Sequence, residues 1–304
     1  METIALARGQ NRAAAVFDLS RGRQALLSVA QPASGAIIAL GILPSTRTIA
    51  LGLVAATAGY LAVFSLNDVL DRRVDRQALA TGEAEAIGFD LDTAFTRHPL
   101  ARGDLTLAAS VVWVAGLAAV SAVCAYLLAP VCLLYFAAAV AIEVIYCALR
   151  SVTWTKTFLS GVMVAVGGLA GWAAVAPVTS AAWSFFAFLA LWEIAGRNLP
   201  NDLSDLGPDS MVGIRTVATA FGPRASARAT LVGAALTLGV LAALPVPLAV
   251  RVASIAAGLL LMGVPAIALL RRPTPEQAAA YFNRASLLPA VVFAIALLGL
   301  LARA

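Results

Sequence analysis

Two short acidic segments of the chain share residue types and a spacing that could hold a divalent cation. The first is NDVLDRRVD at residues 67–75, and the second is NDLSDLGPD at residues 201–209. In each segment an Asn is followed by three Asp residues, which are spaced i, i+3 and i+7. On a helix of about 3.6 residues per turn, this spacing places the three carboxylates on one face. The sequence therefore predicts two acidic helix faces, made by Asp68, Asp71 and Asp75 and by Asp202, Asp205 and Asp209.

Carboxylates gathered in this way need a cation nearby, because they repel one another and unpaired charge beside hydrocarbon is costly. Mg²⁺ meets this need, since it is a hard ion that takes carboxylate, phosphate and water oxygens as ligands. Two acidic helix ends that face each other could hold Mg²⁺ ions on a diphosphate and neutralise its charge as it departs. We predict that all six Asp residues bind Mg²⁺ and that four of them are catalytic, namely Asp68, Asp71, Asp202 and Asp205.

Further side chains around these segments are predicted to bind the substrate. Asn67 and Asn201 begin the two segments and offer neutral oxygen atoms beside the carboxylates. Arginine side chains can clamp phosphate oxygens with forked hydrogen bonds, and lysine can contact them as a point charge. The predicted phosphate contacts are Arg102, Arg150, Lys156 and Arg215.

The elements that must position these residues are membrane-spanning helices. Of the 304 residues, 61% are hydrophobic and 12% are charged, and the mean hydropathy is +0.90. Soluble domains carry about 25% charged residues, and a soluble protein could not hide this much apolar surface from water. Apolar runs of about 20 residues cross a bilayer, and they predict an all-α polytopic membrane protein with about nine transmembrane helices. These spans are predicted at 24–43, 48–66, 105–125, 127–148, 158–177, 182–199, 229–248, 250–270 and 286–302.

The charges of the loops predict an orientation. Of the 21 Lys and Arg residues, 18 fall at one end of the predicted spans and 3 fall at the other. The positive-inside rule makes the basic end cytoplasmic, and both acidic segments lie at that end. We therefore expect a site that faces the cytoplasm. The predicted organisation is a cytoplasmic N-terminal segment (1–23) and a single transmembrane domain (24–304), with an extended cytoplasmic loop at 76–97.

Composition also narrows the partners and the compartment. The net charge of +5 is explained by topology and by anionic lipid head groups, so the expected partner is the lipid bilayer and not a nucleic acid. Cys124, Cys132 and Cys147 lie inside predicted spans without CxxC spacing, which indicates buried free thiols. The single histidine, His98, argues against a His-based metal site. Abundant Ala and Arg with only one Lys suggest a GC-rich bacterial genome, and hence the bacterial inner membrane.

The two acidic segments resemble those of the UbiA-type intramembrane prenyltransferases. NDVLDRRVD resembles the first motif of that family, and NDLSDLGPDSMVGIRT resembles the second, with Gly213 and Thr216 at the family spacing. HPLARGDLT at residues 98–106 is similar to an Arg-Pro-Leu-x-x-Gly stretch of the family, although His98 stands where Arg is usual. Ser210 and Met211 also stand where the second motif often carries basic residues.

The resemblance covers most of the chain and implies a fold and an activity. It implies nine helices around a central cavity, with Mg²⁺ and a prenyl diphosphate bound between the two motifs. Tyr146, Arg150 and Lys156 resemble the Tyr and basic residues of the loop after the fourth span, which makes Tyr146 a further substrate-binding candidate. Within the second motif, Gly207 and Pro208 are expected to end the helix, so that Asp209 would reach the site from a turn.

Three other groups have a functional and a structural interpretation. Glu143, Tyr146 and Arg150 share one helix face, either as a phosphate clamp or as an interfacial Tyr with a snorkelling Arg. Glu193 and Arg197 form an i, i+4 pair that either serves function or orients the second motif. GGLAG at residues 167–171 contains GxxxG, which more often permits close helix packing than chemistry.

The hypothesis is Mg²⁺-dependent transfer of a prenyl group from a polyprenyl diphosphate to an aromatic or other lipophilic acceptor. The diphosphate would enter from the lipid, and a dry cavity would protect the allylic cation from water until the acceptor attacks. Related activities within the superfamily are terpene cyclisation and phosphoribosyl transfer to a polyprenyl phosphate. A membrane transporter is the alternative from another class, although acids at span ends favour it less than acids at the membrane midplane would. The oligomeric state is left open.

Overall fold

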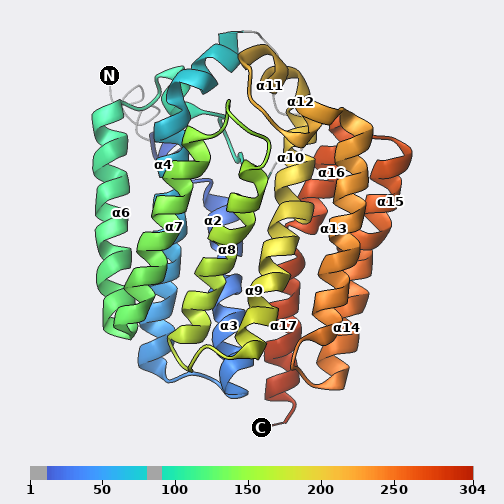
Figure 1. The fold of residues 1–304 in the computed structure, drawn as a ribbon. Coiled ribbons are helices and arrows are strands. Elements are labelled where there is room, and N and C mark those ends of the chain that lie inside the picture. The colour runs from blue at the N-terminus through green and yellow to red at the C-terminus, as the bar shows by residue number, and fades with distance from the viewer. Residues whose placement is uncertain (1–11, 81–90, 304) are drawn as a thin grey trace.

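The computed structural model describes residues 12–80 and 91–303, and every regular element within these ranges is helical. The long helices run side by side along a common direction, and the short helices α11 and α12 lie at one end of the bundle (Figure 1). The all-α membrane architecture predicted from the sequence is confirmed.

The helices follow one another along the chain with short connections. The long ones that build the bundle are α3 (Ala30–Leu40), α4 (Thr46–Ala80), α6 (Leu107–Leu128), α7 (Pro130–Ala148), α8 (Lys156–Ala173), α9 (Ser180–Trp192), α13 (Pro223–Ala243), α14 (Leu248–Gly258), α16 (Pro275–Ala285) and α17 (Leu288–Leu301). The shorter ones are α2 (Gly22–Ser28), α5 (Pro99–Arg102), α10 (Leu199–Ser204), α11 (Leu206–Val212), α12 (Val217–Phe221) and α15 (Val264–Arg271). Two π-helical turns, η1 (Glu193–Asn198) and η2 (Leu259–Gly263), interrupt the longer runs.

Seven helical stretches in the described residues are long and apolar enough to cross a membrane: Thr46–Ala80, Leu107–Leu128, Pro130–Ala148, Lys156–Ala173, Pro223–Ala243, Leu248–Arg271 and Pro275–Leu301. The two remaining predicted spans, 24–43 and 182–199, fall on α2–α3 and α9–η1, where the helix is interrupted. The predicted count of nine is therefore approximate. The last span also starts earlier than the predicted residue 286, because Thr274 caps α16 and Pro275 occupies its first turn.

Helix α4 carries the first acidic segment beyond the membrane. Its 35 residues correspond to about 52 Å of helix, whereas the hydrocarbon core is about 30 Å thick. The end of α4 that contains Asp68 and Asp75 therefore extends past the apolar part of the bundle. The helix continues to Ala80, so the loop predicted from residue 76 begins later, and its residues 81–90 lie outside the described ranges.

Prolines and caps set the boundaries between several long helices. Thr106 begins α6 by accepting a hydrogen bond from the backbone N–H of Ala109. Ala129 separates α6 from α7 with an extended backbone (φ −163°, ψ 140°), which is the conformation that a following proline favours. Pro130 then occupies the first turn of α7, where its missing N–H costs no hydrogen bond.

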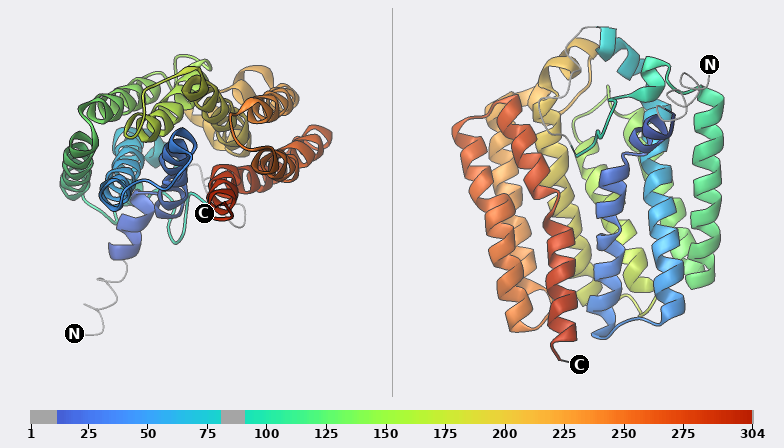
Figure 2. Two further views of the ribbon diagram at one scale, coloured as in Figure 1. Left: turned by 90° about the horizontal axis from the view of Figure 1, so that it is seen from below. Right: turned by 180° about the vertical axis from the view of Figure 1, so that it is seen from behind.

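Each long helix packs on its neighbours, and the ends of the chain close the bundle. Contacts run from α4 to α6, α7, α8, α9 and α13 in succession, and α17 packs on both α14 and α3. Seen along the bundle axis, the helices form a curved wall with α3 on its inner side (Figure 2, left). Helix α3 also packs closely on α8.

Small residues permit the contact between α3 and α8. A Cβ atom on Gly171 would lie 2.0 Å from the carbonyl oxygen of Pro32, and one on Gly35 would lie 2.7 Å from the carbonyl oxygen of Gly168. Distances this short exclude any side chain, so the backbones meet directly. The glycines of GGLAG thus serve helix packing, which was one of the two interpretations of this motif.

We expect Gly171→Ala to destabilise the protein by at least about 1–3 kcal/mol, because the added methyl group must push α3 away from α8. The measurement is thermal unfolding of the purified protein in detergent. Gly116→Ala on α6 is the matched control, since a Cβ there meets nothing within 4 Å. Equal melting temperatures of the two variants would contradict this account of the packing.

Candidate active site

The two acidic segments meet across a polar chamber at the end of the bundle where α5, α10 and α11 lie. This cavity has a volume of about 220 Å³. Its lining includes all but two of the predicted site residues, namely Asn67, Asp68, Asp71, Asp75, Tyr146, Arg150, Lys156, Asn201, Asp202, Asp205 and Asp209. The two exceptions, Arg102 and Arg215, are exposed and lie outside this lining.

Each carboxylate of the first segment faces a basic group. Asp68 lies 3.8 Å from Arg21, and Asp71 lies 2.5 Å from Arg150. Asp75 lies 3.3 Å from Nδ1 of His98. The charges of α4 are thus balanced by groups from three other parts of the chain: the start of α2, the end of α7 and the segment before α5.

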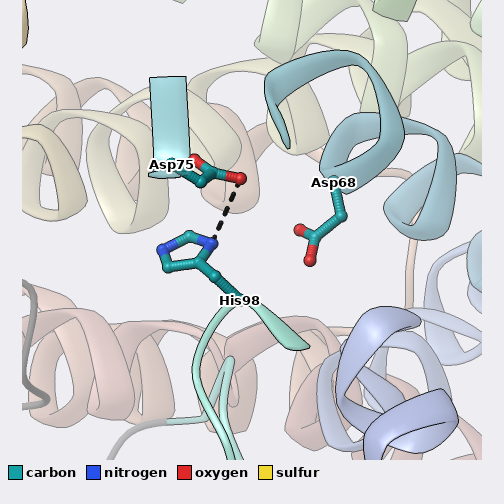
Figure 3. A group of neighbouring side chains, drawn as sticks. All are labelled: Asp68, Asp75 and His98. Carbon is teal, nitrogen blue, oxygen red and sulfur yellow. Dashed lines mark ion pairs between the residues drawn. The ribbon is translucent and has the colours of Figure 1, made fainter. Parts of the chain in front are cut away.

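Asp68, Asp75 and His98 point toward a common centre (Figure 3). One potential ligand atom from each lies within 4.8 Å of the others. Among the described residues this is the group whose geometry could hold a metal ion. The sequence argued against a His-based metal site because only one His is present, but it gave no sign that this His would stand beside Asp75.

The pKa of His98 favours a positive charge at this place. Burial lowers it, but the hydrogen bond and charge of Asp75, together with the charge of Asp68, outweigh burial and raise the pKa above its ordinary value. His98 can therefore act as a cation here.

The second segment faces the first from α10 and α11. Arg97 donates to Oδ1 of Asp205 at 2.8 Å, and Asn201 donates to Oδ2 of the same residue at 3.4 Å. Asp202 is buried, and its Oδ2 accepts no hydrogen bond from any described residue. A buried carboxylate oxygen without a partner is unusual and costly, which makes Asp202 a natural ligand for a cation that binds in the chamber.

The predicted end of the second helix is wrong in detail. The helix breaks at Asp205, whose backbone is not helical (φ −95°, ψ 15°), and a new helix, α11, contains Pro208 and Asp209. Pro208 stands in the first turn of α11, where a proline needs no hydrogen bond from its nitrogen. Asp209 therefore reaches the chamber from a helix and not from a turn. Gly213 ends α11 in the left-handed conformation (φ 75°).

Tyr146 is fixed by two polar neighbours. Lys156 and Asn198 each donate a hydrogen bond to its phenolic oxygen at 3.1 Å. Lys156 is buried at the start of α8, and its ammonium group lies 4.6 Å from the centre of the Tyr146 ring. The structure thus brings together the Tyr and the two basic residues that the sequence grouped by resemblance.

Residues near the N-terminus contribute to the site, and the sequence interpretation missed them. Asp18, Arg21 and Gln24 all line the polar chamber. Arg21 donates to Asp92 and to Asn67, each at 3.0 Å. The only signal in the sequence is their polar i, i+3, i+6 spacing at the start of an apolar span, which the topology argument treated as a cytoplasmic segment.

Asp18 holds the segment 91–98 over the chamber. Its buried carboxylate accepts hydrogen bonds from the backbone N–H groups of Ala94, Phe95 and Thr96 at 2.7, 2.8 and 2.5 Å. A carboxylate that binds three successive backbone donors fixes their direction strongly. This contact places the following residues, Arg97 and His98, between the two acidic segments.

A second, apolar chamber adjoins the polar one inside the bundle. It has a volume of about 370 Å³ and is lined mainly by small and apolar side chains of α3, α4, α6, α7 and α8. Five residues line both chambers and so mark their junction: Val63, Phe64, Met163, Glu193 and Arg197. The site therefore has a charged chamber and an apolar chamber that share part of their walls.

Comparisons with known proteins agree with this arrangement. The apo structure of a UbiA homologue from Aeropyrum pernix K1 has a TM-score of 0.73 at 18% identity, and the match covers 90% of this chain and 97% of that chain. A UbiA homologue from Archaeoglobus fulgidus bound to DMAPP and Mg²⁺ has a TM-score of 0.67 at 18% identity, with 92% and 98% covered. A structure described as digeranylgeranylglyceryl phosphate synthase in membranes also has a TM-score of 0.67, at 16% identity, with 96% and 99% covered.

These structural likenesses show a shared fold, and the sequence itself shows the family. No curated protein sequence matches the chain. The model of the UbiA prenyltransferase family, however, matches residues 28–300. This range includes both acidic segments and nearly all of the helical bundle, and the chain therefore belongs to the UbiA prenyltransferase family.

Proposed function

We propose that this protein transfers a prenyl group from a polyprenyl diphosphate to a lipophilic acceptor, with Mg²⁺ bound between the two acidic segments. The observation that carries the proposal is the pair of adjoining chambers, one lined by carboxylates and basic groups and the other mainly by apolar side chains. A prenyl diphosphate has the same division into a charged head and an apolar tail. We further propose that the site faces the cytoplasm from a bacterial inner membrane, as the loop charges predict.

The residues of the polar chamber fit Mg²⁺. The ion prefers oxygen ligands and is commonly held by carboxylates together with substrate phosphates. The six Asp residues supply such oxygens, and Oδ2 of Asp202 is buried and free of any hydrogen bond within the described chain. When bound, Mg²⁺ would neutralise the charge that develops on the departing diphosphate. Relatives of this fold have been solved with Mg²⁺ and either DMAPP or GPP.

Basic side chains around the acids are suited to bind the diphosphate. Arg97 and Arg150 each contact an Asp across the chamber, at 2.8 and 2.5 Å. Once a divalent cation neutralises these carboxylates, the guanidinium groups can turn to phosphate oxygens, which they bind with forked hydrogen bonds. Lys156 adds a third cation to the lining of the chamber, beside Tyr146.

The apolar chamber supports two further features of the proposed reaction. It excludes water from the allylic carbon when the bond to the diphosphate oxygen breaks. Its length also suggests the size of the donor. The α4 residues that line it run from Thr48 to Phe64, which corresponds to about 24 Å of helix. An extended isoprene unit of four carbon–carbon bonds spans about 5 Å, so the chamber suits a tail of about four to five units.

Three other activities are distinguished by the product. Cyclisation of the donor needs no acceptor, and phosphoribosyl transfer needs a polyprenyl phosphate instead of a diphosphate. A transporter forms no new covalent product. The proposed transfer is tested with radiolabelled geranylgeranyl diphosphate and Mg²⁺ in vesicles of lipid extracted from the source membrane, by chromatography of the labelled lipids.

Asp68→Asn and Asp202→Asn are expected to lower the transfer rate by at least about 100-fold, because each removes a carboxylate that would hold Mg²⁺ against the diphosphate. Melting temperatures in detergent should stay close to that of the parent protein. Asp104→Asn is the matched control, since Asp104 is exposed and lies outside the lining of the polar chamber. Full activity of both chamber variants, or full activity with a chelator present, would refute the metal site.

We expect the Mg²⁺ concentration that gives half-maximal activity to rise as the pH falls from 8 to 6. Burial raises the pKa of Asp202 to about 6, and burial with the charges of Asp205 and Asp202 raises the pKa of Asp209 to about 8. A carboxyl group must lose its proton before it binds the metal. At a pH below the pKa of a carboxyl group, Mg²⁺ must displace its proton. The half-saturating concentration of Mg²⁺ then changes about tenfold per pH unit for each such group.

The measurement is a Mg²⁺ titration of activity at pH 6, 7 and 8. Asp209→Asn should remove the part of the dependence that lies between pH 7 and 8, because it removes the group with the higher pKa. A half-saturating concentration that does not change with pH would contradict these assignments.

Gly52→Leu is expected to shift donor preference toward shorter prenyl chains. Gly52 lines the far part of the apolar chamber, and a Cβ there would meet nothing within 4 Å, so the new side chain would project into the space for the tail. The assay is competition among geranyl, farnesyl and geranylgeranyl diphosphates, with the product chain lengths read by mass spectrometry. Gly116→Leu on the exposed face of α6 is the control, and an unchanged preference in Gly52→Leu would contradict the tail assignment.

A further inference from the structure

The junction of the two chambers contains one charged pair that the proposed diphosphate site does not use. Of the five residues that line both chambers, Val63, Phe64 and Met163 are apolar. The other two are Glu193 and Arg197. In a donor whose head lies in the polar chamber and whose tail lies in the apolar one, the carbon that joins them lies at this junction. Glu193 and Arg197 are therefore beside the reacting bond.

The pair is buried but incompletely bonded. Nη1 of Arg197 lies 3.1 Å from Oε2 of Glu193, and both side chains are less than a tenth exposed. The geometry is that of paired charges without a hydrogen bond, since Oε2 of Glu193 and Nε of Arg197 each have no hydrogen-bond partner in the described chain. A buried ion pair contributes to stability only when its remaining polar atoms are satisfied. Both atoms are buried from solvent, and the residues that carry them line both chambers.

The backbone and the aromatic neighbours hold this pair in place. Both residues belong to the π-helical turn η1, a form of helix that is rare and frequent at functional sites. The guanidinium of Arg197 lies 5.8 Å from the ring centre of Phe64 and 5.6 Å from that of Trp192. Trp192 is itself buried and donates a hydrogen bond to the carbonyl of Ala285 at 2.8 Å. Arg197 is thus fixed, and it fixes Glu193 at the junction.

We propose that Glu193 is the base that removes the proton from the acceptor during prenyl transfer, and that Arg197 positions it. The inference rests on the proposed function. The bond from the prenyl carbon to the diphosphate oxygen breaks, and its electron pair leaves with the diphosphate. An electron pair of the acceptor forms the new bond to the same carbon. The proton that the acceptor loses passes to the carboxylate of Glu193 and then to water in the polar chamber.

This assignment also specifies the class of acceptor. Because Arg197 already balances the charge of Glu193, the pair as a whole is neutral and does not attract an anionic group. It suits an acceptor that presents a neutral proton donor, such as a hydroxyl group on a lipid or an aromatic ring. The carboxylate of Glu193 can accept the proton of that hydroxyl.

The test separates donor binding, donor ionisation and transfer. Glu193→Gln keeps the size of the side chain and removes the base. The first two measurements are Mg²⁺-dependent binding of geranylgeranyl diphosphate and its slow hydrolysis to the prenol in detergent, where water is the acceptor present. The third is transfer in vesicles of lipid extracted from the source membrane. We expect donor binding and hydrolysis to stay within about threefold of the parent protein and transfer to fall by about 100-fold or more.

Two further variants keep the test decisive if Glu193→Gln folds poorly. Glu193→Asp retains a carboxylate and should recover part of the transfer rate. Glu193→Gln combined with Arg197→Met leaves no unpaired buried cation, which is the usual cause of misfolding when one partner of such a pair is removed. The double variant should bind the donor and fail to transfer the prenyl group.

The outcomes distinguish this inference from the proposed function. If the parent protein neither binds geranylgeranyl diphosphate with Mg²⁺ nor forms a labelled lipid, the proposed function fails. If the parent protein is active and the Gln variant transfers at a similar rate, Glu193 is not the base. If binding, hydrolysis and transfer fall together in variants that remain folded, the pair has only a structural role and the inference is overturned.

Discussion

The fold depends on balancing the charge of the acidic groups at the end of the bundle where α5, α10 and α11 lie. Three Asp residues on α4 and three on α10–α11 face one chamber, where their mutual repulsion would be large in a medium of low dielectric constant. Arg21, Arg150 and His98 lie against the first set, and Arg97 lies against the second. These four cations come from three places in the chain, so charge balance also joins the N-terminal helix, the segment 91–98 and the loop after α7 to the acidic helices.

Two residues with strained backbone conformations belong to this arrangement of charges. Among the described residues other than glycine, Arg21 (φ 43°) and His98 (φ 54°) are the ones with positive φ. Each such residue costs about 1–3 kcal/mol and persists only where its surroundings require it. Both line the polar chamber and both face carboxylates of α4. For His98 the surroundings that hold the strained backbone can be named. Asp18 accepts hydrogen bonds from the backbone N–H groups of three preceding residues and so fixes the chain that leads to His98. The strain is therefore located where the cations are held against the acids.

The sequence predicted those features of the site that follow from periodicity and composition. The helical class could be predicted from the apolar runs. The convergence of the two Asp-rich segments could be predicted from those runs together with the i, i+3, i+7 spacing. The contribution of Asp18 and Arg21 could not be predicted, because it depends on the fold of 91–98 back over α2. Arg102 and Arg215 were chosen for charge and proximity in sequence, and the structure leaves both exposed outside the chamber lining. The helical position of Asp209 was missed because a proline can begin a helix as readily as end one.

The proposed reaction accounts for a charged pair that is buried where the two chambers meet. A reaction that separates a water-soluble diphosphate from a lipid-soluble prenyl group must bring both environments to one carbon atom. In the proposed reaction the polar chamber accepts the diphosphate, the apolar chamber keeps water from the cation, and the proton released by the acceptor must still leave through one of them. The polar chamber is lined by carboxylates and basic groups that can carry a proton away. A carboxylate that lines both chambers, as Glu193 does, can accept that proton on the dry side and release it on the wet side. The buried pair thus stands at the position where the proposed reaction needs a base.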